Sequence, residues 1–324
     1  MNARIRNGAL FAVGLAVCYF FYGWNDIKTI AVLGATIRFS VPLVLGALCG
    51  LMGERTGVGN IGIEGQLLGS AFTGFFVASS YGIFAGVVVA VLTGMAIGAF
   101  LALCAVTWRI DQIIAGTVIT IMATGLTSFF YRQGRSLKGQ MPTWRIPLLD
   151  RIPLFGKILF TNPVLTFASI VAVFVVHVML FHTRWGLRTR AVGEHPSAAD
   201  TVGIDVVRMR YVNVTLAGGL AGLAGAFLSI QSASTFERGI SASKGFLALA
   251  LMIMGRWKPI LAWLAALFFG LTSSVASQLL LDKVINIPPQ FVNMLPYVLT
   301  IAALAVFSGK VRAPAAAGTP FVKE

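Results

Sequence analysis

Long apolar stretches separated by short polar segments make up most of this chain. A stretch of about 20 apolar residues can cross the hydrocarbon core of a bilayer as a helix. We therefore predict an all-α, polytopic membrane protein with about ten transmembrane helices in one domain covering residues 1–324. The short stretch 246–256 is either a partial helix or extends back through Ser241. The predicted helices cover residues 8–24, 30–52, 63–80, 82–107, 113–131, 163–182, 212–231, 246–256, 260–281 and 291–307.

The composition agrees with residence in a membrane. Mean hydropathy is +0.85 and only 11% of the residues are charged, against about 25% in ordinary soluble domains. The chain also contains 35 glycines, which allow neighbouring membrane helices to approach closely. Water is therefore not the main solvent of this protein.

The sequence gives little support for a metal site, a disulfide or nucleic-acid binding. Cys18, Cys49 and Cys104 each stand alone inside an apolar run, and the spacing of His177 and His182 does not place them on one helical face. The net charge of +14 is spread between apolar runs rather than gathered on one face. We expect no metal site and no nucleic-acid partner.

Lysine and arginine in the loops predict the orientation, because these residues favour the cytoplasmic side. A cytoplasmic N-terminus places more of the 25 basic residues inside than outside, by a modest margin. Both termini are then cytoplasmic, residues 183–211 form a cytoplasmic loop, and residues 132–161 form an extracytoplasmic loop. The basic character of the 132–161 loop opposes this assignment and fits an external cap or a docking surface.

Residues 53–66 form a polar, glycine-rich segment between two strongly apolar stretches. Such backbone is tolerated at membrane depth only where protein buries it or water lines it. Asn60, Glu64 and Gln66 are candidates for lining or gating a pathway, although Glu64 is equally suited to be a simple charge at a helix N-terminus. Arg38 stands near the middle of a span, at a penalty of about 2.5 to 3.5 kcal/mol, and needs a partner or a cavity. Glu54 or Glu64 could be that partner.

The polar loop 183–211 encodes a short helix of its own. Pro196 is suited to a first helical position and Gly203 to a terminating one. Two turns of small residues make a surface that fits a partner's groove better than an independent core, although a merely solvated connector remains the alternative. The candidate docking residues are Glu194, Pro196, Ser197, Ala198, Ala199, Asp200, Thr201 and Gly203.

A small-residue face follows in the next predicted helix. Gly218 and Gly222 are four residues apart, and Gly225 follows Ala221 at the same spacing. This pattern lets a neighbouring helix approach to backbone contact. We assign these three glycines to helix packing rather than to solute contact.

Three segments of this chain resemble one family of transporters. The run GERTGVGNIGIEGQLLGSAFTG resembles the ER-x-G-x-x-NIG-x-EG motif of bacterial ABC-transporter permeases for nucleosides and related simple sugars. The run GLRTRAVGEHPSAADTVGIDVVRMRY is similar to the GENP-x-AAD-x-x-GI cytoplasmic loop of that family, with His195 where asparagine is common. MGRWKPILAWLAALFFG resembles its GRW-x-P region, so the similarity covers most of the chain.

The resemblance implies a type II-like ABC importer permease in the bacterial inner membrane. It implies a second permease subunit, identical or homologous, together with a cytoplasmic ATPase and an extracytoplasmic solute-binding lipoprotein. It also implies that residues 197–203 form the coupling helix that docks on the ATPase. This chain has no G-x-x-x-x-G-K-[ST] motif. We therefore expect no cofactor on this chain, with ATP and magnesium bound by the partner ATPase.

Two other classes of function fit the sequence less well than a permease. An ion-coupled secondary transporter would also use broken helices and an inverted repeat, for which the pairs Glu54-Arg55 and Glu237-Arg238 give a weak internal echo. Such a carrier normally needs an acid deep in a span, and only Glu64 approaches that position. A membrane enzyme lacks a carboxylate pair or a nucleophile beside a histidine. The chain is therefore expected to be a transport subunit and not an enzyme.

Nucleosides or related sugars are the expected solutes. A nucleoside needs aromatic surfaces for the base and hydroxyl or amide partners for the ribose. Candidates in the spans are Phe72, Thr272, Ser273 and Gln278, beside Arg38, Asn60, Glu64 and Gln66.

Overall fold

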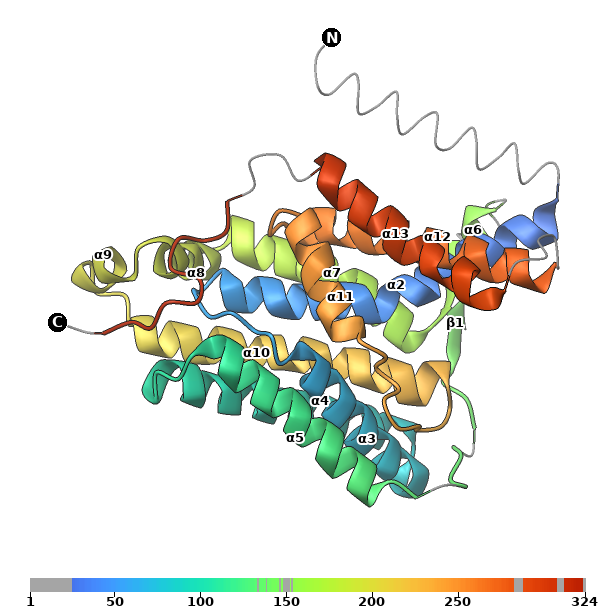
Figure 1. Cartoon of the computed structure of the whole chain (residues 1–324), viewed down its shortest axis with the longest axis horizontal. Helices are drawn as coiled ribbons and strands as arrows, with labels where there is room; N and C mark the ends of the chain where they lie inside the picture. Colours follow the sequence, from blue (N-terminus) through green and yellow to red (C-terminus); the bar gives the residue numbers. More distant parts are fainter. Residues whose placement is uncertain are drawn as a thin grey trace, which may run out of the picture.

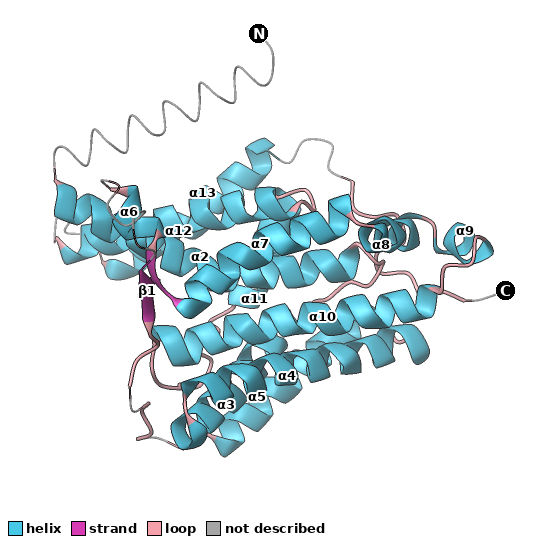
Figure 2. Ribbon diagram, turned by 180° about the vertical axis from the view of Figure 1, so that it is seen from behind, coloured by secondary structure: helices cyan, strands magenta, loops and turns pink. Residues whose placement is uncertain are grey.

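The structure is a computed structural model that describes residues 25–132, 134–137, 139–145, 147, 152, 154–282, 288–307 and 312–322. Within these ranges the chain is a bundle of long helices with one small hairpin (Figures 1 and 2). The helices are α2 Asp26–Glu54, α3 Ile63–Tyr81, α4 Ile83–Ala102, α5 Gln112–Phe130, α6 Phe155–Leu159, α7 Val164–His182, α8 Arg184–Glu194, α9 Pro196–Thr201, α10 Val206–Ala226, α11 Lys244–Met254, α12 Pro259–Leu281 and α13 Pro289–Phe307.

Two of these helices continue as π-helical turns. Leu103–Thr107 follows α4, and Phe227–Ser232 follows α10. The hairpin pairs β1, Thr143–Arg145, with β2, Thr161–Pro163, antiparallel, so that Trp144 lies opposite Asn162. The extracytoplasmic loop predicted at 132–161 therefore contains a short sheet and the five-residue helix α6.

Polar side chains mark where several helices begin. The side chain of Asp111 accepts hydrogen bonds from the N–H groups of Ile113 and Ile114 at the start of α5, and Asp205 accepts one from Arg208 at the start of α10. Pro196 and Pro259 occupy the first turns of α9 and α12, where a missing N–H costs nothing. These four helices therefore start where the local sequence satisfies or removes one of the first backbone donors.

Six helices in the described part of the chain are long and apolar enough to cross a membrane. They are α2, α4 with its π-turn, α5, α7, α10 with its π-turn, and α12. The segments predicted at 63–80, 246–256 and 291–307 are also helical but do not meet the same criterion, and the segment predicted at 8–24 lies outside the described residues. The mostly helical fold is confirmed, and the count of about ten spans stays a prediction.

Helices α2, α7 and α10 run roughly lengthwise, which gives the molecule two ends, while α11 crosses them steeply (Figure 1). At the α9 end, Arg55 donates to the carbonyl of Trp257 and the N–H of Ala316 donates to the carbonyl of Gly193. At the β1 end, Ser136 bridges Thr235 and the N-terminal part of α2 meets the end of α12. The described loops predicted to be cytoplasmic thus gather at the α9 end.

The core lies between α2 and α10. Helix α10 packs against α4, α2 and α3, while α2 also packs against α12 and α11. Gly218 shows how close this packing is, because a Cβ added there would lie 2.2 Å from the carbonyl oxygen of Gly94 in α4. Only glycine permits such an approach of two helix backbones.

Candidate functional site

The glycine-rich segment between α2 and α3 folds as a buried turn at the α9 end. Gly57 has a φ of 86°, which a residue with a side chain rarely adopts. The N–H of Val58 bonds back to the carbonyl of Gly53, and the N–H of Gly59 donates to the side chain of Gln112 at 2.6 Å. Protein groups therefore satisfy several of the N–H groups of this irregular backbone.

Glu64, in the first turn of α3, binds the first turn of α11. Its Oε1 accepts a hydrogen bond from the N–H of Ser243 at 2.9 Å, and its Oε2 accepts one from Gly245 at 2.7 Å. The side chain is 8% exposed. The carboxylate thus occupies the positive end of a second helix, where a negative charge is favoured.

Asn60 and Gln66 lie beside Glu64 but face the interior of the bundle. The Asn60 amide donates to the side-chain oxygen of Gln66 at 3.1 Å and to the sulfur of Cys49 at 3.3 Å. Both polar side chains are fully buried. Their burial favours a role in joining α2 to α3 over direct contact with solute, so a pathway role for these two residues stays a prediction.

A cavity of about 460 Å³ opens between α2, α10 and the start of α11. Its charged lining groups are Arg38 and Lys244. The expected pairing of Arg38 with Glu54 or Glu64 is wrong, because Glu64 binds the α11 backbone and Glu54 accepts a hydrogen bond from Trp257 Nε1. The remaining lining residues are Ala35, Phe39, Pro42, Pro163, Phe227, Leu228, Gln231, Ser232, Ala233 and Ile240.

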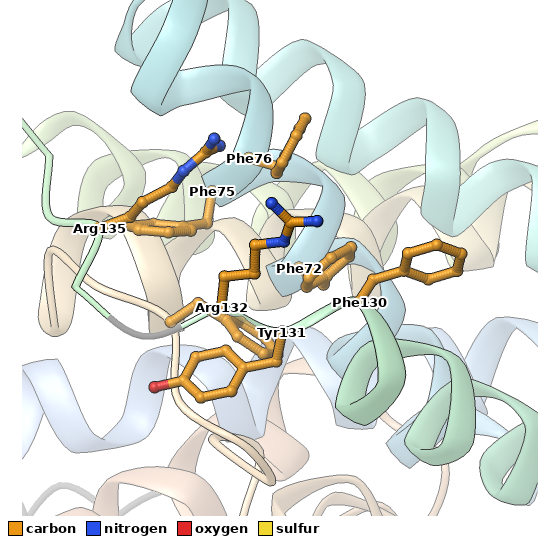
Figure 3. A pocket seen from close by; sticks show the side chains of 8 residues that line it. Phe72, Phe75, Phe76, Phe130, Tyr131, Arg132 and Arg135 are labelled. Atoms are coloured by element: carbon orange, nitrogen blue, oxygen red, sulfur yellow. The ribbon is translucent and has the colours of Figure 1, made fainter.

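A second pocket, of about 440 Å³, lies at the β1 end where α3 and α5 finish. Figure 3 shows that aromatic rings and two arginine side chains surround it. The guanidinium of Arg135 lies 4.9 Å from the ring centre of Phe76, and Phe72 meets Phe236 edge to face at 5.2 Å. Of the predicted pathway residues, only Phe72 lines this pocket. The aromatic lining suits a flat or aromatic group.

The predicted contacts from α12 lie apart from both pockets. The Thr272 hydroxyl donates to the carbonyl of Phe269, and the carbonyl of Ser273 accepts from Ser277. The Gln278 amide donates to Asp282, whose carboxyl has its pKa held below the usual value chiefly by a hydrogen bond from Lys28. These three residues therefore do not line the cavity of Arg38, and their hydrogen bonds do not involve Arg38 or Glu64.

The predicted docking helix forms α9 and projects at the α9 end (Figure 1). Ser197, Ala198, Thr201 and Gly203 are exposed, Pro196 and Asp200 are half-buried, and Glu194 at the end of α8 is exposed. Ala199 is only 3% exposed and packs in a cluster with Val192, Val206 and Met209. Of the two adjacent alanines, only Ala198 is therefore available for contact with a partner.

Helix α8 connects α9 to the glycine-rich turn. A Cβ added to Gly193 would lie 2.2 Å from the carbonyl oxygen of Arg55. Arg55 in turn binds the carbonyl of Trp257 through Nε and Nη2, at 3.2 and 2.9 Å, and lies over the ring of Phe181. Burial lowers the pKa of the Arg55 guanidinium, and the nearby Glu194 carboxylate opposes that shift.

Arg210 is a buried residue that the sequence reasoning did not single out. It donates from Nε to the carbonyl of Thr56 at 3.1 Å and from Nη1 to the carbonyl of Thr319 at 3.0 Å. The C-terminal segment 312–322 thereby lies across the glycine-rich turn, where the N–H of Gly318 also donates to Gly57. In the sequence, Arg210 could be noticed only as an arginine directly before the apolar stretch predicted at 212–231.

The three glycines assigned to packing each face another helix. Added Cβ atoms would lie 2.2 Å from the Gly94 oxygen at Gly218, 2.5 Å from the Ala90 oxygen at Gly222, and 2.5 Å from the Leu67 oxygen at Gly225. The first two contacts are with α4 and the third is with α3. The small-residue face of α10 therefore packs against both α4 and α3.

Comparisons with known proteins agree with this arrangement. Residues 32–304 match the family model described as "Branched-chain amino acid transport system / permease component". The chain is 39% identical to the nucleoside ABC transporter permease protein NupC of Lactococcus lactis, over 92% of this chain and 99% of the relative. It is also 39% identical to the guanosine ABC transporter permease protein NupQ of Bacillus subtilis, over 90% and 96%.

A solved structure supports the fold independently. An inward-facing conformation of a metal-chelate type ABC transporter aligns with a TM-score of 0.51 at 15% identity. The alignment covers 86% of this chain and 85% of the other. At this identity the likeness concerns the arrangement of helices alone.

Proposed function

This chain belongs to the branched-chain amino acid transport system permease family, and from that membership we propose that it carries nucleosides through the inner membrane as one subunit of an ATP-driven importer. The observation that carries the choice of solute is the near full-length similarity to two permeases named for nucleosides and for guanosine. The secondary carrier that the sequence left as an alternative is set aside, because the family consists of transport-system permeases.

The proposed assembly supplies what this chain lacks. A second permease subunit completes the pathway, an extracytoplasmic lipoprotein delivers the solute, and a cytoplasmic ATPase with ATP and magnesium supplies the energy. The termini are then cytoplasmic and the α9 end faces the ATPase. Exposure of Ser197, Ala198 and Thr201 on a helix that projects from the bundle supports this orientation.

The contacts along the chain suggest how movement of α9 reaches the cavity. Helix α8 lies against the carbonyl of Arg55, and Arg55 binds the end of α11 at Trp257. The other end of α11 is held by Glu64 and places Lys244 at the cavity. Displacement of α8 by the ATPase would therefore shift α11 relative to α2, which forms the opposite wall.

Reconstituted uptake tests the proposal. Proteoliposomes containing the chain with its neighbouring permease and ATPase, supplied with the binding protein, should accumulate labelled guanosine and uridine when ATP is present inside. Ribose and leucine serve as competing solutes. Accumulation of leucine or ribose without nucleosides would refute the proposed substrate, and accumulation driven by an ion gradient without ATP would refute the proposed energy source. Neighbouring reading frames for a permease, an ATPase and a lipoprotein would support the assembly.

A further inference from the structure

Arg38 is a cation in the interior of a membrane helix without a carboxylate partner in the described part of the chain. It lies on α2, well inside the span Asp26–Glu54, and its Nη1 lies 3.5 Å from the position of a Cβ added to Gly34. The side chain therefore extends along α2 toward the β1 end and remains exposed at the cavity. A guanidinium at such a site normally faces a ligand or a water-filled space.

Gln231 and Lys244, two other polar residues of the cavity, already have partners. The Gln231 side chain accepts from the N–H of Leu165 and donates to the hydroxyl of Thr166. The Lys244 ammonium donates to the carbonyl of Ser241 and lies in the field of the Glu64 carboxylate. The Ser232 hydroxyl and the ammonium of Lys244 can donate as well, but Arg38 alone among these groups presents its donors as a planar fork that suits two adjacent acceptors.

The remaining lining is apolar and partly aromatic. Phe39, next to Arg38, is 42% exposed, and Phe227, Leu228, Pro42 and Ile240 complete the walls. A volume of about 460 Å³ falls within the range of small-molecule sites. Phosphate or a carboxylate would satisfy Arg38 but leave these apolar walls unused, whereas a heterocyclic base uses both features.

We propose that Arg38 selects 6-oxopurine nucleosides by donating two hydrogen bonds to O6 and N7 of the base, with the ring against Phe39. This inference rests on the proposed nucleoside transport and specifies the solute. Guanine and hypoxanthine present two acceptors on that edge, which match a guanidinium in planar bidentate geometry. Adenine presents a donor beside N7, so one N–H of Arg38 would face an amino group.

Competition between guanosine and 7-deazaguanosine tests the proposal, because the second compound lacks only the N7 acceptor. The wild-type importer should transport guanosine about tenfold more efficiently, the effect of one hydrogen bond to a charged group. Arg38→Met should reduce this preference to about one, and Arg38→Lys, which retains the charge, should give an intermediate value. Lys28→Met is the matched control, because it removes a cation from the same helix outside the cavity.

The binding protein is the same in every assay, so a change in preference belongs to the permease. Equal preferences in wild type, Arg38→Met and Arg38→Lys would overturn the role of Arg38 while leaving nucleoside transport intact. A wild type without any nucleoside uptake would instead refute the proposed function itself. Loss of the preference in Arg38→Met with its retention in Lys28→Met is the expected result.

Discussion

Glu64 accepts a hydrogen bond from the backbone N–H of Gly245, a residue 181 positions later in the chain. The contact joins the first turn of α3 to the first turn of α11. It also explains why residue 245 is glycine, since an added Cβ would lie 2.4 Å from the backbone nitrogen of Glu64. The carboxylate therefore acts at two helix N-termini, its own and that of α11.

Substitution of Glu64 tests this junction. Glu64→Ala leaves the N–H groups of Ser243 and Gly245 without their acceptor, at a cost of about 1–3 kcal/mol for the buried Gly245 group and less for Ser243, which is exposed. We expect a clear fall in the Tm of the detergent-solubilised protein and loss of uptake. Glu64→Gln, which retains one acceptor, should lie between Glu64→Ala and wild type.

Glu237→Gln is the control for that experiment, because Glu237 is an exposed acid at the β1 end. Its Tm and uptake should match those of wild type. An unchanged Tm in Glu64→Ala would contradict the interpretation that the carboxylate holds α11 in place.

The sequence predicted the apolar helices closely but not how they meet. The span predicted at 163–182 is α7, Val164–His182, because bilayer-length apolar runs define their own limits. Helix α11 does not extend back through Ser241, since Ala242 and Ser243 have φ values of 45° and 62°. A periodic pattern carries no information on such a local backbone conformation.

The candidate site was predictable only in its residue types. Glu64 and Arg38 stood out because charges are costly inside a span. Glu64 binds the backbone of α11, which is remote in sequence, and Arg38 lines a cavity instead, so the suggested pairing between them was wrong. Helix α8 was not predicted, because its mixed basic and apolar residues follow no long hydrophobic run.

Close packing of α10 on α4 gives a second prediction. Gly218→Ala would place a methyl group 2.2 Å from the Gly94 oxygen, so the helices must separate. Overpacking of this kind costs about 1–3 kcal/mol, and we expect a lower Tm for the isolated subunit. Gly125→Ala on α5 is the matched control, since no atom lies within 4 Å of the added Cβ, and its Tm should be unchanged or higher because alanine favours the helix. Equal Tm values for both variants would contradict the observed helix contact.

The C-terminal segment gives a third prediction. Removal of residues 314–324 deprives Arg210 of its bond to the Thr319 carbonyl and uncovers the glycine-rich turn. We expect faster amide hydrogen exchange at residues 55–60 and a lower Tm. Thr319→Ala is the control, because the bond from Arg210 ends on a backbone carbonyl that alanine retains. Exchange at the turn that is unaffected by the truncation would show that the segment does not protect it.

Ala198 and Ala199 are adjacent in α9, but Ala198 is exposed and Ala199 is buried. Substitutions at the two positions therefore distinguish an effect on docking from an effect on folding. Ala198 is exposed, so Ala198→Arg should leave Tm unchanged while abolishing ATP-dependent uptake, because a long charged side chain cannot enter a groove that fits a small one. Ala199→Arg would bury a charge against Val192 and Met209 and should lower Tm as well. Ala198→Ser is the control and should retain uptake. If Ala198→Arg still imports solute with ATP, α9 is not the surface through which the ATPase acts.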